Sequence, residues 1–151
     1  MNSQTKQLPP RHRAILERFV LACQADEGVV AAFLSGSYAR GKADAYSDLD
    51  LGLLTTDAAY EDFGTRQGAF IRQLGEPLFL EDFDIPNMVF FIFENGVEGE
   101  LAFAPESQLD QLHSGPSSVL LDKRGLFPGA MFTPHTSPSA GQIETLRRQV
   151  F

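Results

Sequence analysis

The sequence has little of what builds disulfide scaffolds and zinc sites. Its 151 residues include a single cysteine, Cys23, so no disulfide can close within the chain. Cys23 follows the helical apolar pattern of residues 15–22, which favours a buried role over a reactive thiol. His12, His113 and His135 lie far apart, without the spacing of zinc ligands. The sequence therefore predicts neither a disulfide scaffold nor a zinc site.

Long apolar runs and positive charge are also scarce. No apolar run approaches the ~20 residues that a membrane-spanning helix needs, and residues 1–10 lack the basic and apolar regions of a signal peptide. We therefore expect a cytoplasmic protein without a membrane partner. Twelve Lys and Arg against twenty Asp and Glu give a formal net charge of −8, which repels the phosphate backbone of nucleic acids. Nucleic acid is thus an unfavourable partner, and a bound nucleotide would need a divalent cation to offset its charge.

The chain does contain enough apolar residues for one domain with its own core, because 43% of them are hydrophobic. Apolar spacing predicts helices over 9–26 and 57–74, the second weakened by two glycines, and a short helix from Pro105 to about Leu112. Apolar runs and alternation predict strands at 29–34, 47–54, 76–83, 88–95, 97–103 and 119–122, with a tight antiparallel hairpin at Asn95-Gly96. We expect an α/β fold of the α+β type, with a mixed, largely antiparallel sheet of about five strands flanked by helices.

Residues 139–151 are predicted to form a C-terminal amphipathic helix beyond the domain of residues 1–138. Ser139 and Gln142 have the spacing of a capping box, and apolar residues follow along one side. Such a helix docks on its own domain, binds a partner, or begins a further helical domain, and these alternatives stay open. We expect a homodimer or a hetero-partner through it.

Two aspartates share one face of the strand at 47–54. Asp48 and Asp50 alternate with leucines, so their Cβ atoms lie roughly 6–7 Å apart and point the same way. This geometry suits a shared cation, and hard oxygen ligands without His or Cys favour Mg²⁺. An isolated Asp-Leu-Asp is nevertheless more typical of an ordinary solvent-facing strand.

A small-residue turn precedes the aspartates. Gly36 lets the backbone approach a ligand closely, and Ser37 offers a hydroxyl and an N–H at the start of a predicted short helix whose dipole favours phosphate. Alone, the pair is equally typical of a helix cap. The sequence contains neither GxxxxGK[ST] nor GxGxxG, which excludes the P-loop and Rossmann classes.

Taken together, GSYARGKADAYSDLDL (residues 36–51) resembles the signature of the DNA polymerase beta-like nucleotidyltransferase superfamily. The resemblance implies the nucleotidyltransferase fold and transfer of a nucleoside monophosphate, AMP from ATP, onto an acceptor hydroxyl. It implies that Gly36 and Ser37 hold the triphosphate and that Asp48 and Asp50 coordinate Mg²⁺. Further candidate cations beside the triphosphate are Arg40, Lys42 and Lys123.

The superfamily also needs a third carboxylate on a later strand. Glu98 and Glu100 alternate onto the same face of the strand at 97–103. Glu100 fits the family's apolar-carboxylate-apolar pattern better, so it is our candidate for the third metal ligand and the base, although the family usually has Asp there. Glu98 stays open as the alternative third carboxylate. Glu100 could instead be an ordinary surface charge on an edge strand, with no role in the site.

Two branches of the superfamily resemble this chain and imply different acceptors. Aminoglycoside and lincosamide nucleotidyltransferases modify a hydroxyl of a small-molecule antibiotic, and an acidic surface suits a polycationic aminoglycoside. Minimal antitoxin enzymes of about this length adenylylate a tyrosine of a HEPN toxin partner. A third alternative is a non-catalytic domain of the same fold that binds nucleotide or regulates a partner.

Overall fold

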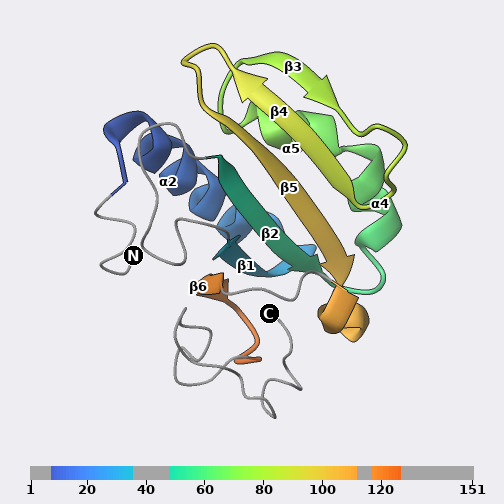
Figure 1. The fold of residues 1–151 in the computed structure, drawn as a ribbon. Helices are drawn as coiled ribbons and strands as arrows, with labels where there is room; N and C mark the ends of the chain where they lie inside the picture. The colour runs from blue at the N-terminus through green and yellow to red at the C-terminus, as the bar shows by residue number, and fades with distance from the viewer. Residues whose placement is uncertain (1–7, 36–47, 112–116, 127–151) are drawn as a thin grey trace.

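The computed structural model describes residues 8–35, 48–111 and 117–126, which form one sheet with helices on one of its faces (Figure 1). Three helices contribute side chains to a single core with the strands. The helical elements are α2 (Pro10–Ala25), α4 (Tyr60–Thr65), α5 (Gln67–Arg72) and the 3-10 helix η1 (Glu106–Gln111). The strands are β1 (Val29–Ser35), β2 (Leu49–Thr55), β3 (Pro77–Glu81), β4 (Met88–Phe93), β5 (Glu98–Pro105) and β6 (Ser117–Asp122).

The six described strands follow the order β3-β4-β5-β2-β1-β6. All neighbouring pairs are antiparallel except β2 and β5, which run parallel. The prediction of a mixed, largely antiparallel sheet is therefore confirmed. The sheet has six described strands where about five were expected, and the strand predicted at 119–122 is part of β6, which pairs with β1.

The core lies between the sheet and the helices. The leucines of β2 alternate toward the helices, where Leu49, Leu51 and Leu53 are buried. Phenylalanines fill the space between the layers, and the Phe63 ring lies 5.0 Å from that of Phe103. The prediction that Cys23 is buried is also confirmed, and its burial raises the pKa of the thiol.

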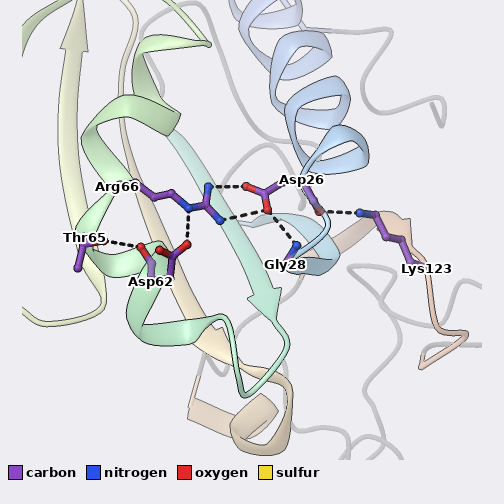
Figure 2. Close-up of polar contacts among 6 residues, drawn as sticks. All are labelled: Asp26, Gly28, Asp62, Thr65, Arg66 and Lys123. Carbon is purple, nitrogen blue, oxygen red and sulfur yellow. Dashed lines mark hydrogen bonds and ion pairs between the residues drawn. The ribbon is translucent and has the colours of Figure 1, made fainter.

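The prediction of one continuous helix over 57–74 was wrong. The segment forms two short helices, because the chain leaves helical geometry at Arg66 (φ −119°, ψ 17°) between α4 and α5. Arg66 donates hydrogen bonds to Asp62 at 2.8 Å and to Asp26 at 2.6 and 3.1 Å (Figure 2). These ion pairs hold α4 against the turn between α2 and β1.

Asp26 joins three parts of the fold at that turn. Its carboxylate accepts hydrogen bonds from Arg66 and from the Gly28 backbone N–H, and its backbone carbonyl accepts one from Lys123, just after β6 (Figure 2). Burial alone would raise the pKa of Asp26, but these hydrogen bonds and the nearby positive charges outweigh it and lower the pKa. The Asp26 carboxylate therefore stabilises the fold in its ionised form.

The predicted hairpin between β4 and β5 is confirmed. Gly96 has a φ of +90°, a conformation that glycine adopts without steric cost. The Asn95 side chain accepts a hydrogen bond from the Val97 N–H at 3.0 Å, which supports the turn. Within the described ranges, no helix has both the length and the apolar character to cross a membrane. The C-terminal helix predicted at 139–151 lies outside them.

Candidate active site

The parallel pair β2 and β5 brings two of the predicted carboxylates together. Asp50 of β2 is in register with Glu100 of β5, and on its other side with Ser35 of β1. The neighbouring leucines Leu49 and Leu101 are buried among the core residues. Because side chains alternate along a strand, Asp50 and Glu100 lie side by side on the face opposite the helices. Both are half-buried.

Asp48 adds a third negative charge to this face. It directly precedes β2, two residues from Asp50, and is exposed. The pKa of Glu100 is raised, first by burial of its carboxyl group and second by the charge of Asp48. The Asp48 charge is therefore close enough to disfavour the ionised form of Glu100.

Glu98 occupies a different position from Glu100. It begins β5, is exposed, and is in register with Ile92 of β4. Register thus puts Glu100, rather than Glu98, beside Asp50. Glu98 instead lines, together with Asp48, a cavity of about 220 Å³ at this end of the sheet.

Gly99, between the two glutamates, lets β5 pack tightly at this point. A Cβ at residue 99 would overlap the backbone carbonyl oxygen of Leu49 and lie 2.7 Å from Cζ of the buried Phe91 ring. Any side chain there would push against β2 or Phe91 next to the carboxylates.

The residues present suit a hard divalent cation in their chemistry. Among the described residues, no three or more His, Cys, Asp or Glu side chains are gathered as a complete metal site. Mg²⁺ does not need one, because it keeps several waters and binds through one or two carboxylates together with substrate phosphates. The adjacent Asp50 and Glu100 offer such oxygen donors. Burial raises the pKa of Glu100 most and the charge of Asp48 adds to it, and a cation would offset that charge.

The residues predicted to hold the triphosphate are Gly36, Ser37, Arg40 and Lys42, and all four fall in 36–47, outside the described residues. The described residues that flank this segment, Ser35 and Asp48, lie at the same end of the sheet as Asp50.

The suggestion that Lys123 helps to bind the triphosphate is not supported. Its Nζ donates to the carbonyl of Asp26 at 2.9 Å, and its backbone N–H donates to Val30. Val30 lies at the start of β1, at the opposite end of that strand from Ser35. Lys123 therefore stabilises the fold at a distance from the carboxylates.

Sequence reasoning missed an aromatic cluster beside the carboxylates, formed by Phe79, Phe83 and Phe90. Phe90 of β4 is in register with Glu100, and the three rings contact one another in series. The available signal was the alternation in β4, which points Phe90 away from the buried Phe91 toward the face opposite the helices.

The family comparison bears directly on this geometry. A family model described as the nucleotidyltransferase domain matches residues 16–112, well over half of the chain, and includes β2 and β5 with all three candidate carboxylates. This chain belongs to the nucleotidyltransferase domain family. Nucleotidyl transfer is the general reaction of this family, so the transferase class expected from residues 36–51 is confirmed.

Two solved structures resemble this nucleotidyltransferase domain over part of their lengths. An aminoglycoside 6-adenyltransferase from Bacillus subtilis is 19% identical, with a TM-score of 0.46 over 82% of this chain and 42% of that one. The apo form of a CCA-adding enzyme is 13% identical, with a TM-score of 0.41 over 65% of this chain and 21% of that one. The chain thus spans less than half the length of either protein. No curated protein sequence matches it significantly.

Proposed function

We propose that this domain transfers AMP from ATP to a hydroxyl group of a small-molecule acceptor in a Mg²⁺-dependent reaction. The observation that supports the proposal most strongly is the register of Asp50 with Glu100 on parallel strands, with the charge of Asp48 acting on Glu100. Asp48, Asp50 and Glu100 would hold divalent cations, which neutralise the triphosphate and lower the pKa of the acceptor hydroxyl. Gly36, Ser37, Arg40 and Lys42 would hold the triphosphate.

Glu100 would accept the hydroxyl proton as the general base, because register places its carboxyl group beside Asp50 at the proposed cation site. In the proposed step the acceptor oxygen forms a bond to the α-phosphorus, while the bond from the α-phosphorus to the bridging oxygen breaks. The hydroxyl proton passes to Glu100, and pyrophosphate leaves with the electron pair of the broken bond.

The proposal is tested by incubating the protein with labelled ATP, Mg²⁺ and a panel of hydroxyl-bearing acceptors that includes aminoglycosides and lincosamides. We expect acceptor-dependent pyrophosphate release that falls by about 10²-fold or more in Asp50→Asn, because the cations lose a ligand. The matched control is Glu61→Gln, an exposed carboxylate on α4 that should leave the rate unchanged.

Other outcomes of the same experiment would replace the proposal. Label transferred to a co-purified protein instead of a small molecule would make the acceptor a protein, as in the antitoxin-type enzymes. Nucleotide binding without transfer to any acceptor would indicate a regulatory domain. Equal rates for Asp50→Asn and the unmodified protein would contradict the assignment of the carboxylates.

A further inference from the structure

The cavity of about 220 Å³ combines negative charge with aromatic surface. Two carboxylates line it, Asp48 and Glu98, together with apolar side chains that include the aromatic cluster and Ile92. The described residues that line it include no Lys or Arg. Such a surface attracts a cation and also offers rings on which an apolar group can pack.

The rings of the aromatic cluster are open to a ligand. The residues Phe79 and Phe83 are 41% and 57% exposed, unlike the phenylalanines of the core. The Phe83 ring lies 5.3 Å from that of Phe90 and 6.0 Å from that of Phe79. The backbone of Phe83 has a φ of +50°, and its N–H donates to the carboxylate of Glu81 at 3.1 Å. The turn between β3 and β4 thus brings Phe83 against Phe90 of the sheet.

The strand order places this cluster on the acceptor side of the carboxylates. Along the sheet, Phe90 of β4 is followed by Glu100 of β5 and then by Asp50 of β2, all in register. Ser35, the last described residue before the segment proposed to hold the triphosphate, pairs with Asp50 from β1, on the other side of β2. An acceptor hydroxyl that gives its proton to Glu100 therefore comes from the side of β4.

We infer that the acceptor is a hydroxyl-bearing amine whose body is an aromatic or apolar ring, an inference that rests on the proposed function. The protonated amine pairs with Glu98, which the proposed function does not use as a metal ligand, and the ring packs on Phe79 and Phe83. The cavity is smaller than the roughly 300–1,000 Å³ of pockets for drug-sized ligands, so it accepts one ring with a short arm. A highly hydroxylated cation would leave the aromatic cluster without a matching surface.

The test compares two ligands that differ mainly in charge. 2-Amino-1-phenylethanol carries a ring, a hydroxyl and a protonated amine, whereas mandelate carries a carboxylate in place of the aminomethyl group. Binding to the full chain is measured by calorimetry without nucleotide, with glucosamine as the cation that lacks an apolar ring. We expect the amine to bind about 10-fold or more tightly than mandelate and several-fold more tightly than glucosamine.

Variants connect the binding to the aromatic cluster. Phe83→Asn should weaken amine binding by about 3- to 10-fold, and asparagine tolerates the positive φ at this position. The matched control is Leu21→Gln, which removes an exposed apolar side chain from α2 and should change nothing. Equal binding of the amine and mandelate, no measurable binding of the amine, or equal binding by Phe83→Asn would each overturn the inference. A lower sedimentation mass in Phe83→Asn would also overturn it, because a second copy would then cover the cluster.

Pyrophosphate release separates this inference from the proposed function. If the amine binds through Phe83 but no acceptor releases pyrophosphate, the ligand class is supported and the proposed function fails. If other acceptors release pyrophosphate while the amine neither binds nor reacts, the inference fails and the proposed function stands.

Discussion

Replacing Gly99 with alanine should both destabilise the protein and misalign Glu100. The added Cβ would overlap the carbonyl oxygen of Leu49 and lie 2.7 Å from Cζ of Phe91. The second distance is about 0.8 Å shorter than an ordinary contact of about 3.5 Å between carbon atoms. Neither neighbour can give way easily, because one is backbone in the sheet and the other is a ring with 1% exposure.

The expected magnitude follows from that displacement. Overpacking in a core costs about 1–3 kcal/mol, and we expect the upper end because a backbone atom is involved. A shift approaching 1 Å beside Glu100 should lower the rate of nucleotidyl transfer by about 10²-fold. Urea unfolding followed by circular dichroism gives the first quantity, and pyrophosphate release at a temperature where the variant stays folded gives the second.

Gly64→Ala is the matched control for this substitution. A Cβ at residue 64 would lie 3.9 Å from the Phe103 ring, an ordinary contact, and the residue is in α4. Alanine there should be neutral or stabilise by about 0.5–1 kcal/mol, with unchanged activity. If Gly99→Ala matched the unmodified protein in both stability and rate, the close packing of β5 against β2 and Phe91 would be refuted.

Three further predictions concern charge. Glu100→Gln should raise the free energy of unfolding at neutral pH, because the raised pKa means that ionised Glu100 is disfavoured in the fold. The gain should disappear below about pH 4.3, where the carboxyl group is protonated in the folded and the unfolded protein. Urea titrations in which the variant and the unmodified protein do not become equally stable at low pH would contradict this prediction. Asp26→Asn should lower the free energy of unfolding by about 1–3 kcal/mol at neutral pH. At a pH well below the ordinary aspartate pKa of about 3.9 the loss should be small, because a carboxylate with a lowered pKa stops stabilising the fold once it is protonated. The exposed pair Arg124–Glu106 is its control, and Arg124→Gln should cost at most about 1 kcal/mol in the same denaturation assay. Mg²⁺ should raise the melting temperature of the unmodified protein but raise that of Asp50→Asn less, and equal shifts in calorimetry would exclude Asp50 as a ligand.

Much of the fold was predictable because the patterns were local. The leucines of β2 alternate with polar residues and glycine, the helix at Pro10–Ala25 has apolar residues at helical spacing, and Asn95-Gly96 marks a hairpin. The break at Arg66 lies between Gly64 and Gly68, the two glycines that weaken the predicted helix, whereas the ion pair of Arg66 with Asp26, 40 residues away in the chain, was not predictable. The pairing of β6 with β1 likewise depends on contacts between distant segments.

The candidate site was predictable only in part. Strand alternation predicted the shared face of Asp48 and Asp50, and the family pattern favoured Glu100 over Glu98. The parallel register of β2 with β5, which places Glu100 beside Asp50, was not predictable from the sequence. The aromatic cluster escaped sequence reasoning because Phe79 and Phe90 belong to different strands, and an apolar residue in a strand is usually core. Lys123 was suggested as a triphosphate-binding residue, but its position after β6 places it beside the start of β1, at the opposite end of that strand from Ser35 and the carboxylates.

A crystal structure of the full chain with Mn²⁺ and a non-hydrolysable ATP analogue would test directly whether Asp48, Asp50 and Glu100 bind metal. Anomalous scattering locates the metal independently of any assumption about its ligands. We expect metal bound by carboxylate oxygens of Asp48, Asp50 and Glu100, at about the 2.0–2.1 Å typical of Mg²⁺ or slightly longer. Metal and nucleotide bound together elsewhere on the domain, with these carboxylates uncoordinated, would contradict this expectation.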